Sequence, residues 1–106
     1  MRKASIYMND ILAGYLQENE NGYQFQYLKE YLSDAQNSPI SLTLPLQEEG
    51  FEDKNLFPFF DGLIPEGWLL NITQENWKIN QRDRMGLLLL CCRDCIGAVS
   101  VVEIKE

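Results

Sequence analysis

Strict alternation of aromatic and amide side chains at residues 23–27 is the feature of this sequence that most limits its fold. Tyr23, Phe25 and Tyr27 alternate with Gln24 and Gln26. Because successive side chains of a β-strand point to opposite faces of the sheet, this period of two predicts a strand with one buried and one solvated face. The fold must therefore contain a sheet that is covered on one face.

Other segments have the pattern of strands that could join this one. Residues 4–8 and 11–16 are apolar stretches on either side of the turn pair Asn9-Asp10, which predicts a β-hairpin. Residues 40–46 alternate as well, with the apolar side chains on one face. Proline has no N–H for a ladder, so we expect this strand to end, bulge or lie at an edge at Pro45.

The second half of the chain has helical spacing, after one short helix expected over residues 28–32. Residues 56–63 carry apolar side chains at intervals of three and four, which predicts an amphipathic helix that Pro65 ends. Pro65 can also begin a new helix that runs towards Trp77, a residue that we expect to be structural.

A further helix is expected through Met85 to Cys92, with Asn80 or Gln81 as its cap and with Asp83 and Arg84 as helix-end charges. Gly97 then leads into a last strand over residues 98–102. Strands followed by helices and one returning strand indicate an α+β fold, with a small, mainly antiparallel sheet and the helices segregated beside it. The 106 residues are expected to form a single domain.

Composition excludes several classes of function. The formal net charge of −7 argues against direct nucleic-acid binding, which depends on lysine and arginine side chains that neutralise phosphates. The longest apolar run, residues 86–92, is far shorter than the ~20 residues of a membrane-spanning helix, so we expect no membrane contact. No secretory signal is recognisable, and a cytoplasmic location is expected.

Enzymatic chemistry is not expected either. The chain has no histidine, the commonest general base, and its three cysteines lack an activating partner. Neither a glycine-rich phosphate loop nor the motif set of protein kinases is present. The acidic pairs, such as Glu48-Glu49, are typical of a solvated surface. We therefore expect no catalytic residue, no cofactor and no metal site, and we expect the protein to act by binding.

Three pieces of the chain together resemble the N-terminal subdomain of HipA-type serine/threonine kinases. They are residues 39–46 (PISLTLPL), residues 59–67 (FFDGLIPEG), and residues 86–88 with 94–99 (GLL and DCIGAV). Kinases of this family continue beyond the last motif into a kinase fold, whose lysine, catalytic-loop and metal-binding residues are missing here. The resemblance therefore extends to a stand-alone, HipS-like antitoxin of a tripartite HipB, HipS and HipT system.

The resemblance implies a non-enzymatic protein that binds and inhibits a HipT-like serine/threonine kinase toxin. A HipB-like helix-turn-helix protein would supply DNA binding in a ternary complex. An alternative is a detached structural or activating subdomain that completes a split HipA-like kinase. A third possibility, an unrelated small enzyme on an α+β scaffold, would need a reactive group that the sequence does not show.

The stretch around Pro65, Glu66, Gly67 and Trp68 is the candidate partner-binding site. A tryptophan at the start of a helix, held by Pro65 and Gly67, could project as a rigid aromatic anchor that enters the active-site cleft of the kinase or docks against its N-lobe. It could equally pack into the core of this domain. Asp61 and Glu66 flank the same break, and each could pair with a basic residue of the kinase or serve only in capping and solubility.

Overall fold

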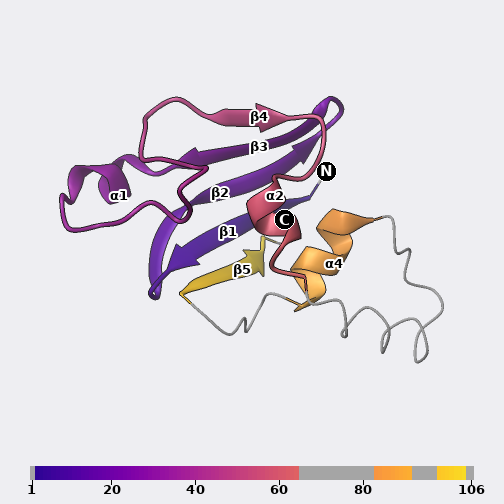
Figure 1. Cartoon of the computed structure of the whole chain (residues 1–106). Helices are drawn as coiled ribbons and strands as arrows, with labels where there is room; N and C mark the ends of the chain where they lie inside the picture. The colour runs from indigo at the N-terminus through magenta and orange to yellow at the C-terminus, as the bar shows by residue number, and fades with distance from the viewer. Residues whose placement is uncertain (1, 65–82, 92–97, 105–106) are drawn as a thin grey trace.

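The structure, a computed structural model, describes residues 2–64, 83–91 and 98–104. The strands are β1 (Lys3–Met8), β2 (Ile11–Asn19), β3 (Gly22–Tyr27), β4 (Phe51–Asp53) and β5 (Val99–Glu103). The helices are α1 (Lys29–Ser33), α2 (Pro58–Asp61) and α4 (Arg84–Cys91) (Figure 1). Within these residues no helix is long and apolar enough to cross a membrane.

The strands form one sheet in the order β4-β3-β2-β1-β5, and every neighbouring pair is antiparallel. β1 and β2 are joined by the turn at Asn9 and Asp10, whose φ angles of 52° and 66° are left-handed. Two such residues in succession are typical of a hairpin turn whose twist matches that of the strands. The predicted hairpin, the predicted last strand and the α+β class are confirmed.

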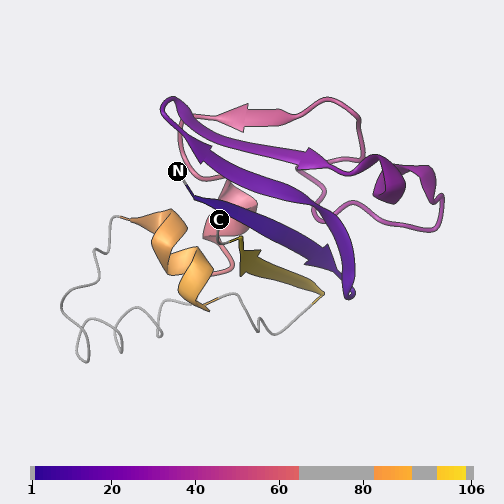
Figure 2. The same cartoon turned by 180° about the vertical axis from the view of Figure 1, so that it is seen from behind.

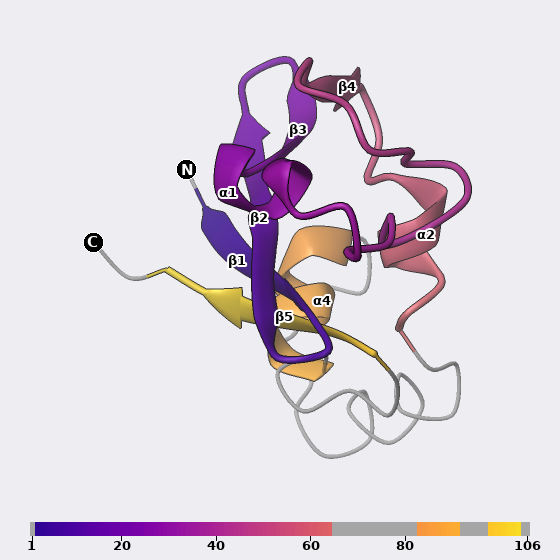
Figure 3. The same cartoon turned by 90° about the vertical axis from the view of Figure 1, so that its left-hand side faces the viewer.

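Two of the described helices cover one side of the sheet. α2 and α4 lie over the same face (Figure 3), and the view from behind shows strands with no described helix across them (Figure 2). α1 lies at one end of the sheet instead. An antiparallel sheet can leave one face in water when its side chains alternate between apolar and polar, and the pattern at residues 23–27 meets this condition.

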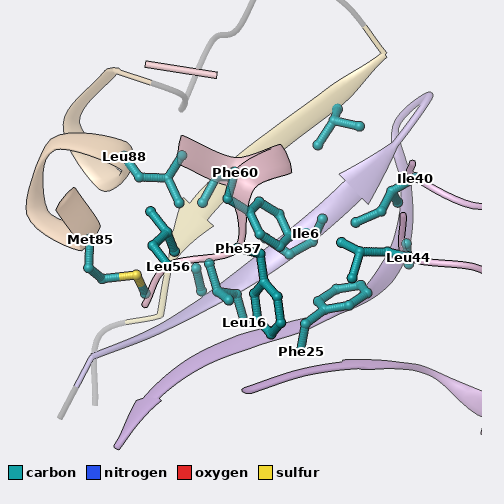
Figure 4. Packing of buried hydrophobic residues seen from close by; sticks show 14 of the residues in the cluster. Ile6, Leu16, Phe25, Ile40, Leu44, Leu56, Phe57, Phe60, Met85 and Leu88 are labelled. Carbon is teal, nitrogen blue, oxygen red and sulfur yellow. The ribbon is translucent and has the colours of Figure 1, made fainter. Parts of the chain in front are cut away.

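The core lies between the covered face and the helices (Figure 4). β3 contributes Phe25 and Tyr27, which are buried, whereas Gln26 between them is exposed. The Phe25 ring meets the Phe60 ring of α2 edge to face, with centroids 5.6 Å apart. The other buried hydrophobic side chains from the strands and from the described part of α4 are those of Ala4, Ile6, Ala13, Leu16, Val99, Val101, Met85, Leu87 and Leu88.

The strand expected over residues 40–46 is wrong. Ile40 and Leu44 are buried, but Leu42 between them is exposed, and a single bridge joins Ser41 to Leu44 across a tight turn. Two local features favour the turn. The Ser41 hydroxyl accepts the Thr43 N–H at 3.2 Å, which competes with strand pairing, and Pro45 has no N–H for a ladder.

The edge position beside β3 is taken by β4, a strand that the sequence pattern does not predict. α4 begins at Arg84, and the residues expected to cap it, Asn80 and Gln81, lie outside the described residues. The Asp83 carboxylate accepts the Gly86 N–H at 3.1 Å, as N-cap side chains do. The helix expected from Pro65 to Trp77 lies outside the described residues.

The Tyr27 hydroxyl should contribute measurably to stability. It accepts the Ile40 N–H at 3.0 Å and donates to the Leu44 carbonyl, both in the buried part of the molecule. Tyr27→Phe would leave both backbone groups without a partner, and we expect it to lower the free energy of unfolding by about 1–3 kcal/mol in urea denaturation.

Tyr15→Phe is the matched control for this prediction. The Tyr15 ring lies under the Lys3 ammonium on the uncovered face, and within the described residues its hydroxyl has no hydrogen-bond partner. We expect a change within about 0.5 kcal/mol. Equal effects of the two substitutions would contradict the assigned role of Tyr27.

Candidate functional site

Arg2 joins the sheet to the start of α4. Its guanidinium donates to the Glu18 carboxylate of β2 at 3.0 Å and 2.7 Å, and to the Asp83 carboxylate through two bonds of 2.7 Å. Both contacts are bidentate, the geometry in which arginine holds a carboxylate most firmly. Arg2 therefore fixes the start of α4 relative to β2.

The charges of this cluster stabilise one another. Hydrogen bonds from Arg2 hold the pKa values of Glu18 and Asp83 below their usual range, and the two carboxylates raise the pKa of Arg2. Burial, followed by the charge of Glu18, raises the pKa of the nearby Tyr23. At neutral pH the cluster therefore holds two carboxylates and one guanidinium, an arrangement suited to structural pairing rather than to proton transfer.

Gly86 makes room for this cluster. A Cβ at this position would lie 2.4 Å from Asp83 Oδ2 and 3.0 Å from Arg2 Nη1. A side chain here would displace the carboxylate that both caps α4 and binds Arg2. The glycine of the GLL motif thus allows Asp83 to make both contacts at once.

Asp61, one of the predicted site residues, has a partner within the domain. Its Oδ1 lies 2.5 Å from Nε of Arg84, and this pair ties the end of α2 to the first turn of α4. The two side chains remain 42% and 33% exposed, respectively. The predicted contact between Asp61 and a kinase stays a prediction, and any such contact would have to share the carboxylate with Arg84.

The remaining predicted site residues, Pro65, Glu66, Gly67 and Trp68, lie outside the described residues. The described residues on either side of this stretch are fixed by contacts within the domain. Ile64 is 5% exposed in the core, and Asp83 is bound to Arg2. The pair of Asp61 and Arg84 therefore joins the two flanks of residues 65–82.

A hollow of about 360 Å³ borders this ion pair. Tyr23, Lys54, Asn55 and Leu56 line it together with Asp61 and Arg84. Within the described residues no group of three or more histidine, cysteine, aspartate or glutamate side chains could hold a metal ion. The lining offers charges of both signs for binding and no arrangement of a nucleophile with a base.

Comparison with known proteins identifies the domain. The profile of the HipA N-terminal domain matches residues 4–102. The chain belongs to the HipA N-terminal domain family. A solved structure of the N-terminal domain of a HipA toxin superposes with a TM-score of 0.78 at 27% identity, and the match covers all of this chain and 95% of that one.

Two kinds of relative share this HipA N-terminal domain. An uncharacterized protein of Haemophilus influenzae is 31% identical over 106 residues, which is all of this chain and 96% of that protein. A putative kinase, Y4mE of Sinorhizobium fredii, is 27% identical over 92 residues, but these are 22% of its length. HipA in a Shewanella oneidensis complex with HipB and operator DNA shares the fold, with a TM-score of 0.72 at 22% identity over 23% of its chain.

Sequence reasoning missed the Arg2 cluster. Asp83 and Arg84 were recognised as helix-end charges, and the structure confirms this. Their partners, however, lie 81 and 23 residues away, and no local spacing indicates such pairs. The one available signal was Gly86 three residues after Asp83, a position where a capping side chain meets the backbone.

The pairing of Asp61 with Arg84 can be tested by exchanging the charges. Asp61→Arg or Arg84→Asp alone places like charges together, and we expect each to lower the free energy of unfolding by up to about 1 kcal/mol. The double exchange should restore most of the loss in urea denaturation. Additive losses in the double variant would show that the two side chains do not act as a pair.

The Arg2 cluster predicts a pH dependence of stability. The pKa values of Glu18 and Asp83 are lower in the folded state than their ordinary values of 4.5 and 3.8. Their contribution is therefore complete above these values and is lost as the pH falls through and below them. We expect the urea midpoint to fall more steeply on acidification for the wild type than for Arg2→Gln, and parallel curves would contradict this.

Proposed function

We propose that this chain is a non-enzymatic antitoxin subunit that binds and inhibits a HipT-like serine/threonine kinase. The observation that carries the proposal is the end-to-end match to a Haemophilus influenzae protein of nearly the same length. The same domain makes up about a fifth of the putative kinase Y4mE. A family whose members occur both as a domain of larger kinases and as separate small proteins is suited to bind a kinase as a separate subunit.

Trp68 is the proposed anchor of the complex. Tryptophan is enriched among the residues that dominate binding energy at protein interfaces. Pro65, whose ring fixes its φ angle, precedes it by three residues, and Glu66 adds a negative charge near it in the sequence. We place Trp68 in the active-site cleft of the kinase, with Glu66 and Asp61 near basic residues of the cleft wall.

The net charge supports a chain that binds the kinase and leaves DNA binding to another protein. The net charge of −7 favours a basic partner surface and disfavours contact with DNA phosphates. A Shewanella oneidensis HipA is known in a complex with HipB and operator DNA. By analogy, a HipB-like helix-turn-helix protein would bind the operator in a cytoplasmic ternary complex, and this chain would contact the kinase.

A second candidate function rests on the position of the domain within kinases. Where the domain is part of the kinase, as in Y4mE, it could help to build the active enzyme. A detached copy would then complete a split HipA-like kinase and raise its activity. The two functions predict opposite effects on the same reaction.

Autophosphorylation of the purified kinase, measured with and without this chain, separates them. The antitoxin reading predicts suppression by the wild type, and at least about tenfold weaker inhibition by Trp68→Ala, since a buried aromatic anchor contributes 2 kcal/mol or more. Trp68→Phe, which keeps an aromatic ring, should inhibit to an intermediate degree.

Circular dichroism of each variant serves as the control for folding. Stimulation of the kinase by the wild type would support the completing subdomain instead. Full inhibition by a folded Trp68→Ala variant would show that Trp68 is not the anchor of the complex.

A further inference from the structure

Leu42 is the most exposed large apolar side chain in the described part of the protein. It is 96% exposed, compared with 49% for Ile11 and 36% for Leu46. Scattered apolar residues on a surface are common and by themselves indicate nothing. Leu42 differs because the backbone that carries it is held in one conformation.

Hydrogen bonds within the turn hold this backbone. The Leu44 N–H donates to the Ser41 carbonyl at 3.1 Å, and the Thr43 N–H donates to Ser41 Oγ at 3.2 Å. The hydroxyls of Ser41 and Thr43 lie 3.0 Å apart and form a further bond. Three contacts thus converge on Ser41 and leave Leu42 at the tip of the turn.

The base of the turn is fixed to the sheet. Ile40 and Leu44 are buried at 5% and 3% (Figure 4). The Tyr27 hydroxyl of β3 bonds to the backbone of both. Binding through a side chain whose backbone is already ordered loses less conformational entropy than binding through a mobile loop. The turn therefore has the properties of a preorganised contact.

The acidic residues that follow the turn indicate which charge a partner surface would carry. Residues 39–53 contain four acidic residues, Glu48, Glu49, Glu52 and Asp53, and no lysine or arginine. All four side chains are exposed. A complementary surface has an apolar pocket for Leu42 and basic side chains opposite this acidic segment. A second copy of this chain would bring the same acidic segment and is disfavoured by like charge.

We infer that the turn at residues 41–44 is a second docking contact for the kinase, in which Leu42 fills an apolar pocket with a basic rim. The inference rests on the proposed function and adds a contact that Trp68 does not provide. It also assigns a role to the PISLTLPL motif, whose alternation does not form a strand.

The affinity of the purified HipT-like kinase for Leu42→Ser, measured by titration calorimetry, tests the inference. Loss of a buried leucine side chain should raise the dissociation constant by about tenfold or more. The urea midpoint should stay unchanged, because Leu42 makes little contact with its own domain. Leu42→Met, which remains apolar, should bind nearly as well as the wild type.

Ile11→Ser is the matched control, since it also removes an exposed apolar side chain but at the start of β2. We expect its dissociation constant to stay within about twofold of that of the wild type. Equal affinities of Leu42→Ser and the wild type would overturn the docking contact, and loss of binding by Trp68→Ala in the same series would leave the antitoxin function in place.

A wild-type chain that does not bind the kinase would overturn both the docking contact and the proposed function. Sedimentation provides the last check. A concentration-dependent dimer that Leu42→Ser abolishes would assign the turn to a second copy of this chain, and would overturn the kinase contact.

Discussion

The packing of Phe25 against Phe60 is the contact on which the rest of this small domain depends. α2 has four residues and could not persist as an isolated helix. It is held because the Phe60 ring is buried against β3, in a cluster where Phe25 also meets the rings of Tyr27 and Phe51. The position of α2 then determines where Asp61 lies.

The ion pairs add to this packing because they fix the orientation of α4. Pairs that are one third exposed contribute little free energy individually, but Arg2 and Asp61 bind neighbouring residues, Asp83 and Arg84, at the start of α4. α4 is thereby tied to β2 on one side and to α2 on the other. Because β5 pairs with β1, the two ends of the chain are brought together in the same part of the sheet.

The elements that could be predicted from the sequence are those whose signal is local. The alternation at residues 23–27 and the turn pair Asn9-Asp10 each predict their structure, because side-chain period and left-handed turn geometry act over a few residues. β4 could not be predicted in this way, since a strand of three residues has no measurable period. The partners of Arg2 and Arg84 depend on the tertiary fold and leave no pattern in the sequence.

Residues 40–46 show why a local signal can also mislead. Their alternation is as regular as that of residues 23–27, yet Leu42 is exposed, while Ile40 and Leu44 are buried. A strand would place Ile40, Leu42 and Leu44 on one face, whereas a turn anchored at both ends buries only Ile40 and Leu44, and hydrogen bonding decides between them. Here the Ser41 and Tyr27 hydroxyls satisfy the backbone groups that a strand would pair with a neighbour. The candidate site is less predictable still, because the local sequence proposed Asp61 but could not indicate that Arg84 already occupies it.

Both proposed contacts with the kinase depend on β3. Phe25 holds α2, from which the chain leads to Trp68, and Tyr27, two residues later on the same face, holds the turn that carries Leu42. In the proposed complex, the two anchors are 26 positions apart in sequence, and β3 holds the turn that carries one and the helix that precedes the other. Two separated anchors determine the orientation of a partner as well as its affinity, which a single tryptophan cannot do. In the proposed complex, the domain would in this way hold the kinase in one inactive arrangement.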